Sequence, residues 1–465
     1  MVGTPIPANL ARFRLGALPA LLRGEARFAE GDATAWAEGV FLDSRREGGL
    51  FVALRGERHD AHRFVAGLPA GVPAVVERAF LAGGGDPGRR PVVVVEDTLE
   101  ALGDLAREHR RRFDVAVVAI TGSAGKTTTR SHVEAALRGA GLRVRASAGN
   151  LNNRVGLPMS ALTLTEGDDA LVLEAGMNQP GEIARLAAIA EPTVALVTLV
   201  ARAHTEGVGG IEGVFREKTS LLDGLRPGGV AIVNGDDARL APWRGEGPVL
   251  RVGTGETADI KLGIPRLEGL STVVEIRVGA AAHTLRLQQL GAGAAHAAGF
   301  ALAVVHALGG DLRAAAAALA EVPPVPGRLV PRALGDRLVL DDAYNANPAS
   351  MRLALRTGAE LAAARGVPFF AVLGDMRELG DDEGPAHREV LAEAVARAAK
   401  LVTVGDAFAG AGSEVALADA SEAAGWARDL SAEPAVFLVK GSRSLGLEGV
   451  VDALLEALDD AGDGP

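Results

Sequence analysis

Short apolar runs alternate with longer segments of helical pattern through the middle of the chain. Each run is nearly continuous, which is typical of strands that are buried on both faces of a parallel sheet. The runs cover residues 115–120, 170–174, 193–199 and 230–233. The segments between them predict helices at residues 126–140, 180–190 and 211–225. This order predicts a doubly wound parallel sheet for the central part of the chain.

The two flanking parts show the same alternation on a smaller scale. The N-terminal part predicts strands at residues 49–54, 72–76 and 92–95 and a helix at 99–112. The C-terminal part predicts strands at residues 338–341, 369–373, 401–404 and 436–439, separated by helices. The proline-rich segment 322–327 breaks any helix and is typical of a linker. We therefore predict an α/β fold with domains at residues 1–112, 113–326 and 327–465.

Composition agrees with a globular protein of several domains. The chain has 465 residues, of which 48% are hydrophobic and 23% charged, and a formal net charge of −11. This negative charge disfavours nonspecific binding to nucleic acid or to anionic membranes. The absence of cysteine excludes disulfides and cysteine nucleophiles, and it fits a reducing compartment. Neither the N-terminal segment nor residues 294–308 resemble a signal peptide or a membrane span, so we expect a cytoplasmic protein without membrane insertion.

A glycine-rich turn with a lysine and hydroxyls follows the first central strand. Gly122 and Gly125 let the backbone curl so that its N–H groups face an anion, while Lys126 reaches phosphates and Thr127 can bind magnesium. The predicted nucleotide-binding residues are Gly122, Ser123, Ala124, Gly125, Lys126, Thr127 and Thr128. The general phosphate-loop pattern has a glycine where this chain has Ile120, so a strand, turn and helix without nucleotide stays an alternative.

Polar residues also follow the other central strands. Ligands of open α/β sheets lie beyond the carboxyl ends of the strands, where Glu174, His204 and Asp236 are found. Glu174 can hold magnesium opposite Thr127, because a hard cation beside phosphates prefers carboxylate and hydroxyl oxygens. A solvated loop carboxylate is the alternative for Glu174. By itself, Lys218 would be an exposed lysine of a helix.

Several motifs, in matching order and spacing, resemble the Mur ligase family, the muramyl ligases of peptidoglycan synthesis. In the central part they are Thr-Gly-x-x-Gly-Lys-Thr at 121–127, Gly-Asn-Leu-Asn-Asn at 149–153, Glu-Ala-Gly at 174–176, Gly-Glu-Ile at 181–183 and Ala-His-x-Glu-Gly at 203–207. In the C-terminal part they are Pro-Gly-Arg at 326–328, Asp-Asp-Ala-Tyr-Asn-Ala-Asn-Pro-x-Ser-Met at 341–351, Gly-Asp-Met-x-Glu-Leu-Gly at 374–380 and Lys-Gly-Ser-Arg at 440–443. Near the N-terminus they are Asp-Ser-Arg at 43–45, Leu-Phe-Val-Ala-Leu-x-Gly-Glu at 50–57 and Asp-x-His-x-Phe at 60–64.

The resemblance implies a fold and an activity. It implies an N-terminal UDP-sugar-binding domain, a central ATPase domain of phosphate-loop type and a C-terminal Rossmann-like domain. The C-terminal motifs resemble the branch of the family that joins D-alanyl-D-alanine to UDP-N-acetylmuramoyl-tripeptide. The implied enzyme is an ATP-dependent, ADP-forming ligase that uses Mg²⁺ and works through an acyl phosphate. We expect a monomer, although no motif of the sequence indicates the oligomeric state. A sister ligase that adds a single amino acid, or a catalytically silent relative that binds nucleotide or UDP-sugar, remains the alternative.

The resemblance also implies roles for particular residues. Lys126 would hold phosphates, Thr127 and Glu174 one magnesium ion, and His204 with Glu174 a second. Lys218 would be carbamylated on its side chain and become an anionic magnesium ligand. The residues implied near ATP are Arg328, Asp342, Tyr344 and Asn345, and those implied near the substrates are Ser44, Arg45, Asn150, Asn152, Asn153 and Asn347.

The chain departs from the family pattern at the implied adenine site. Where the family has Gly-x-His-Asn-x-x-Asn, this chain has Gly-Ala-Gly-Ala-Ala-His-Ala at residues 291–297, so the two asparagines are missing and His296 stands nearby. This departure concerns nucleotide affinity and base selectivity more than the reaction. The sequence does not indicate whether the third residue of the tripeptide is diaminopimelate or lysine.

Overall fold

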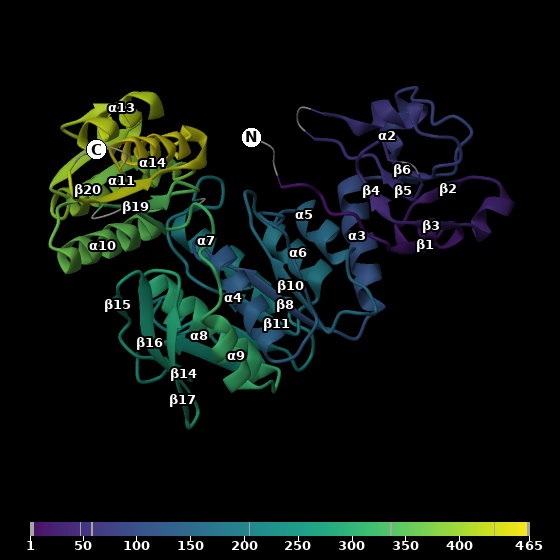
Figure 1. The fold of residues 1–465 in the computed structure, drawn as a ribbon. Helices are drawn as coiled ribbons and strands as arrows, with labels where there is room; N and C mark the ends of the chain where they lie inside the picture. Colours follow the sequence, from purple (N-terminus) through teal and green to yellow (C-terminus); the bar gives the residue numbers. More distant parts are fainter. Residues whose placement is uncertain are drawn as a thin grey trace.

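The computed structural model describes residues 4–46, 48–56, 59–203, 205–334, 337–431 and 433–462. Figure 1 shows three lobes that follow the order of the chain, with the central lobe between the N-terminal and C-terminal ones. The three-domain α/β architecture expected from the sequence is therefore confirmed. No helix of the described residues is long and apolar enough to cross a bilayer.

The central lobe is built on a ten-stranded sheet with the order β15-β16-β14-β13-β12-β11-β8-β10-β9, in which β17 also pairs with β16. Its parallel strands are β8 (Ala116–Thr121), β9 (Val144–Ala146), β10 (Ala170–Glu174), β11 (Val194–Val197), β12 (Val230–Asn234), β13 (Val249–Gly253) and β14 (Ile260–Leu262). In this register Glu174 lies beside Ile120, and Val197 lies beside Thr121. The carboxyl ends of β10, β8 and β11 therefore meet at the glycine-rich turn.

Helices cover both faces of the central sheet. Along β8, Val117 and Ala119 pack on one face, and Val118 and Ile120 pack on the other. The first face is covered by α3 (Thr98–Arg111), α5 (Gly156–Ala161), α6 (Glu182–Ala190) and α7 (Gly210–Asp223). The second face is covered by α4 (Lys126–Gly139), α8 (Ala292–Ala307) and α9 (Leu312–Leu319). The doubly wound sheet predicted from the apolar runs is confirmed.

The far edge of this sheet was not predicted from the sequence. There, β16 (Ser271–Val278) pairs antiparallel with β14, with β15 (Arg266–Glu268) and with β17 (Ala281–Leu287). Residues along β16 alternate between the core and solvent, so these strands lack the continuous apolar runs of the parallel strands.

The N-terminal lobe has a five-stranded sheet of order β2-β7-β6-β5-β4 and a separate pair, β1 with β3. Its elements are β1 (Arg12–Arg14), α1 (Leu18–Leu21), β2 (Glu25–Arg27), β3 (Trp36–Glu38), β4 (Val40–Phe41), β5 (Leu50–Val52), β6 (Ala74–Glu77), α2 (Arg78–Ala82) and β7 (Val92–Val95). Helix α3 begins after Asp97, whose carboxylate accepts hydrogen bonds from the N–H groups of Leu99 and Glu100. Residues of α3 belong to one apolar core with residues of the N-terminal lobe and of α5 and α6.

The C-terminal lobe has a six-stranded sheet of order β18-β19-β23-β20-β21-β22. Its strands are β18 (Val330–Leu334), β19 (Arg337–Asp342), β20 (Phe369–Gly374), β21 (Lys400–Val404), β22 (Ala416–Leu417) and β23 (Val436–Lys440). Its helices are α10 (Pro348–Arg365), α11 (Glu383–Val395), α12 (Asp406–Gly410), α13 (Ala420–Leu430) and α14 (Glu448–Gly462). The predicted linker, residues 322–327, has no helix or strand.

Candidate active site

The glycine-rich turn is already shaped for an anion. Gly122 has φ +150° and Gly125 has φ +81°, a left-handed conformation that glycine adopts without strain. A Cβ atom at Gly122 would lie 1.9 Å from Oγ1 of Thr198, and this hydroxyl donates to the carbonyl of Ala124 at 2.6 Å. Helix α4 starts directly after the turn, and no side chain of the described residues caps its N-terminus. Its first N–H groups are therefore available for phosphate oxygens.

Lys126 lies against this turn. Its Nζ donates to the carbonyl oxygen of Gly122 at 2.7 Å. Burial lowers the pKa of Lys126, while the nearby carboxylate of Glu174 acts in the opposite direction. The side chain is thus held where the predicted phosphate contact requires it.

Glu174 connects three elements of the central lobe. It ends β10, it is 2% exposed, and its Oε2 accepts from Oγ1 of Thr127 at 3.0 Å. Its Oε1 accepts from Nδ2 of Asn152 at 2.8 Å. Nε of Arg130 lies 3.8 Å from Oε2 and has no hydrogen-bond partner in the described part of the chain. The predicted pair Thr127 and Glu174 is therefore brought together, and Arg130 is a neighbour that sequence reasoning missed.

Lys218 is the most unusual side chain of the site. It is 0% exposed, and its Nζ has no hydrogen-bond partner among the residues that the structure describes. Burial, followed by the positive charge of Lys126, lowers the pKa of Lys218 well below its ordinary value, although Glu217, Glu174 and Glu182 oppose this shift. The default expectation of an exposed helical lysine is wrong. In α7 the residues Val214, Lys218 and Leu222 share the buried face, a spacing that could have shown this burial in the sequence.

The C-terminal lobe contributes side chains to the same turn. Nη2 of Arg328 donates to Oγ1 of Thr127 at 3.2 Å, and Nδ2 of Asn347 donates to the carbonyl of Ser123 at 3.1 Å. The ring of Tyr344 lies between two guanidinium groups, at 4.4 Å from Cζ of Arg328 and 4.8 Å from Cζ of Arg443. Arg443 belongs to a motif noted in the sequence but was not assigned a role there.

A buried ion pair holds the loop that carries Tyr344. Nζ of Lys440 lies 2.8 Å from Oδ2 of Asp342 and donates to the carbonyl of Asn345 at 2.8 Å. Burial raises the pKa of Asp342, and the charge of Lys440 acts against this shift. The side chain of Asn345 accepts from the N–H of Ala346 at 2.8 Å. These contacts fix residues 342–347 opposite the phosphate turn.

A cavity of about 1280 Å³ opens beside Thr127 and runs along α4 toward Gly139. Residues from all three parts of the chain line it. They are Thr4, Pro5, Thr127, Arg130, Ser131, Glu134, Ala135, Arg138, Gly139, Gly149, Asn150, Ala318, Glu321, residues 322–326, Arg328, Tyr344 and Arg443. This volume is sufficient for a large ligand beside the phosphate turn.

Other predicted residues lie elsewhere or have structural partners. Oδ1 of Asn153 accepts from the N–H groups of Val155 and Gly156 at the start of α5. Asn150 lines the cavity and accepts from Thr4. Arg45 is mostly exposed and forms an ion pair with Asp43 at 2.6 Å, which lowers the pKa of Asp43 to about 2. Ser44 precedes Arg45 in the same N-terminal loop.

The structure describes the predicted metal ligands Thr127, Glu174 and Lys218 but not His204. His204 lies outside the described residues. Within the described part of the chain, no three histidine or carboxylate side chains converge as metal ligands. Thr127 and Glu174 offer a hydroxyl and a carboxylate oxygen, which suit magnesium beside phosphates.

The segment that departs from the family pattern lies at the start of α8. Nε2 of His296 is 3.0 Å from Oδ2 of Asp236, which follows β12. This contact is the main reason why the pKa of Asp236 falls to about 2. His296 is therefore engaged by a carboxylate of the central lobe.

Comparisons with known proteins agree with this geometry. The family model described as Mur ligase middle domain matches residues 120–305, and the one described as Mur ligase, glutamate ligase domain, matches residues 327–443. The chain belongs to the Mur ligase family.

Within this family the similarity extends over whole chains. The chain is 35% identical to the UDP-N-acetylmuramoyl-tripeptide–D-alanyl-D-alanine ligase of Escherichia coli, over 95% of this chain and 98% of that relative. A crystal structure of MurF from Acinetobacter baumannii superposes with a TM-score of 0.87 at 30% identity, covering 96% of this chain and 100% of the other. MurF ligase from Thermotoga maritima, crystallised with ADP, gives a TM-score of 0.79 at 28% identity, covering 91% and 98%.

Proposed function

We propose that this protein is the ATP-dependent ligase that joins D-alanyl-D-alanine to UDP-N-acetylmuramoyl-tripeptide in peptidoglycan precursor synthesis. One observation carries this proposal: groups from both sides of a cleft converge on Thr127 in a chain that matches such a ligase over nearly its full length. Glu174 reaches Thr127 from the central lobe, and Arg328 reaches it from the C-terminal lobe.

The reaction has two steps. A carboxylate oxygen of the tripeptide attacks the γ-phosphorus of ATP, which releases ADP and forms an acyl phosphate. The amine of the dipeptide then attacks the acyl carbon, a proton leaves the nitrogen, and the tetrahedral intermediate expels phosphate to give the amide. Lys126, the N–H groups of the turn and Arg328 stabilise phosphate charge, so positioning and electrostatics account for most of the catalysis.

Magnesium fits the donor set beside the turn. Thr127 and Glu174 would hold it, and Lys218 would join them as a carbamate, which forms when the neutral amine adds to carbon dioxide and loses a proton. A bound magnesium ion would neutralise phosphate charge. The burial of Lys218 and its lowered pKa support this role, because only the neutral amine reacts.

The same proposal assigns a separate function to each lobe. We place the UDP-binding part at residues 1–112, with Ser44 and Arg45 as UDP contacts, the ATP-binding part at 113–326 and the ligase part at 327–465. Asn150, Asn152, Asn153 and Asn347 would face the substrates, and Asp342, Tyr344 and Asn345 the nucleotide. A monomer in the cytoplasm, where ATP is supplied, completes the proposal.

A phosphate-release assay tests it directly. Release should require ATP, the UDP-tripeptide and D-alanyl-D-alanine together, and it should stop when any one is omitted. A catalytically silent relative would release no phosphate under any of these conditions. Intact Lys126, Glu174 and Lys218 at one site argue against a silent protein, because a scaffold has no use for this charge cluster.

A further inference from the structure

The N-terminal segment crosses from the N-terminal lobe to the central lobe. At one end, Nδ2 of Asn9 donates to the carbonyl of Val40 at 2.8 Å, and its Oδ1 accepts from the N–H of Val40 at 2.9 Å. At the other end, Oγ1 of Thr4 donates to Oδ1 of Asn150 at 2.8 Å. Figure 1 shows this segment leaving the N-terminal lobe and pointing toward the middle of the molecule. We call residues 4–9 the N-terminal strap.

The sequence of the strap favours a stiff, extended connection. Pro5 and Pro7 fix their φ angles, and no residue of the strap is in a helix or strand. Such a chain extends by about 3.1 Å per residue, so the five steps from Asn9 to Thr4 span about 15 Å. The position of Thr4 is therefore tied to that of strand β4.

The contact at Thr4 depends on a close approach of its side chain to the backbone of Gly149. Gly149 has φ +49°, and a Cβ atom there would lie 2.3 Å from Oγ1 of Thr4. The N–H of Asn150 is 3.5 Å from the same oxygen. Because residue 149 is glycine, the hydroxyl of Thr4 can reach the loop that carries Asn150 and Asn152.

This loop contacts Glu174, which lies beside the phosphate turn. Nδ2 of Asn152 binds Oε1 of Glu174 at 2.8 Å, and the other oxygen of Glu174 binds Thr127. Thr4, Pro5 and Asn150 also line the large cavity beside Thr127. Thr4 and Pro5 are thus part of the cavity wall beside the phosphate turn, which the peptide of the substrate would contact.

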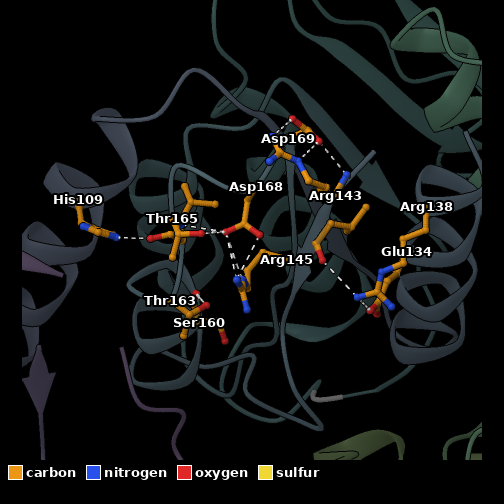
Figure 2. Close-up of polar contacts among 12 residues, drawn as sticks. His109, Glu134, Arg138, Arg143, Arg145, Ser160, Thr163, Thr165, Asp168 and Asp169 are labelled. Carbon is orange, nitrogen blue, oxygen red and sulfur yellow. Dashed lines mark hydrogen bonds and ion pairs between the residues drawn. The ribbon is translucent and has the colours of Figure 1, made fainter. Parts of the chain in front are cut away.

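Pro7, Ala8 and Asn9 of the strap line a second cavity of about 400 Å³, beside β9. Figure 2 shows that the polar side chains of this region are engaged with one another. Arg145 pairs with Asp168 at 3.2 Å, and Oγ1 of Thr165 donates to Asp168 at 2.8 Å. Oγ1 of Thr163 donates to the carbonyl of Ser160 at 2.7 Å. These polar groups already have partners, so we assign the functional contact of the strap to Thr4.

We propose that Thr4 is a positioning residue for the peptide end of the UDP-linked substrate, acting through the loop of Asn150 and Asn152. This inference rests on the proposed function. Thr4 connects the lobe proposed to bind UDP with the loop that orients Glu174. This connection fixes the position of the nucleotide-sugar end of the substrate relative to its reacting carboxylate.

Thr4→Val tests the proposal, because it removes the hydroxyl and keeps the shape of the side chain. Binding of the UDP-tripeptide, measured by calorimetry, should weaken about threefold to tenfold, as expected for one lost hydrogen bond. The KM for ATP and the Tm should not change. Thr4→Ser should bind like the parent. Thr34→Val is the matched control, because Oγ1 of the exposed Thr34 donates to the carbonyl of Gly31 at 3.0 Å within the N-terminal lobe.

Two results would overturn the proposal: equal UDP-tripeptide affinity in Thr4→Val and the parent, whatever the Tm, or an equal loss of affinity in Thr34→Val. The proposed function can fail separately. A parent enzyme that binds the UDP-tripeptide but releases no phosphate would refute the ligase activity, while the affinities of the Thr4 variants still decide the role of the strap. A parent that does not bind the UDP-tripeptide would overturn both.

Discussion

Single residues of the site differ in how far the sequence could define them. Lys126 and Thr127 stand in a local motif, so their contacts with Gly122 and Glu174 follow from the turn itself. The burial of Lys218 agrees with its helical spacing from Val214 and Leu222, but the charged groups around it could not be derived from the sequence, because they depend on how α7 packs against the sheet. Arg130 gave no sequence signal, since a helical arginine is usually solvated. Its position beside Glu174 emerges only from the fold.

For Lys126→Ala we predict at least an approximately hundredfold loss of turnover, because one preorganised electrostatic contact with phosphate is removed. The fold should survive, since no core volume is lost, and circular dichroism with a thermal melt checks this. Turnover within about threefold of the parent would contradict the assigned role.

For Lys218→Ala we predict a severe loss of turnover, because the variant lacks the group that becomes the anionic carbamate. Added acetate should restore part of the activity by placing a carboxylate in the vacated space. Lys261→Ala is the matched control, because Lys261 is exposed on β14 and should tolerate the change with an effect under about 0.5 kcal/mol on stability. Full activity of Lys218→Ala at low magnesium concentration would return Lys218 to a purely structural role.

At the scale of elements, strands with continuous apolar runs were predictable, whereas strands at the open edge were not. Strand β10 was predicted at its observed bounds, and β8 and β12 were within one residue. Strands β15, β16 and β17 were missed, because one face of each is exposed and alternation of this kind also occurs in loops. Residues 342–347 were recognisable as a motif, but their contact with Ser123 depends on how two lobes meet.

Helix α4 links the phosphate turn to the interlobe linker. Nδ1 of the buried His132 lies 2.8 Å from the carbonyl of Thr128. The neighbouring Gln289 donates through Nε2 to the carbonyls of Val322 and Pro323, both at 2.8 Å. The first residues of the linker are thus fixed to the same layer as α4.

His132 predicts a specific pH dependence of stability. Burial lowers the pKa of His132 from 6.5 to about 4. Between these values the unfolded chain binds a proton that the folded chain does not, so the free energy of unfolding should fall as pH is lowered from 6.5 to 4. The full contribution of His132 to the free energy of unfolding is about 3 kcal/mol.

Denaturant melts test this dependence. The free energy of unfolding of His132→Gln should fall less over this pH window, whereas His306→Gln, at an exposed position, should behave like the parent. Equal slopes in all three proteins would contradict this account.

At the scale of the whole molecule, polar contacts connect the central and C-terminal lobes. Oγ1 of Thr205 donates to the carbonyl of Leu379 at 2.7 Å, and Arg202 pairs with Glu389 at 3.1 Å. The ion pair is substantially exposed and contributes little by itself. Ligands that bind both lobes should therefore determine how far the protein closes.

We predict compaction when an ATP analogue and the UDP-tripeptide are added together. The linker at residues 322–327 permits the motion, and closure would protect the acyl phosphate from water. Small-angle scattering should show a smaller radius of gyration with both ligands than without them. An unchanged radius of gyration at saturating ligand would contradict closure.

We propose that this chain joins a dipeptide, and not a single amino acid, to the UDP-linked tripeptide. The most direct test is mass spectrometry of the nucleotide-linked product formed with ATP when D-alanyl-D-alanine and single amino acids are offered together. The account predicts one adduct, carrying both alanine residues, with one ADP formed per adduct. An adduct that carries a single amino acid, or no adduct while ATP is bound, would contradict it.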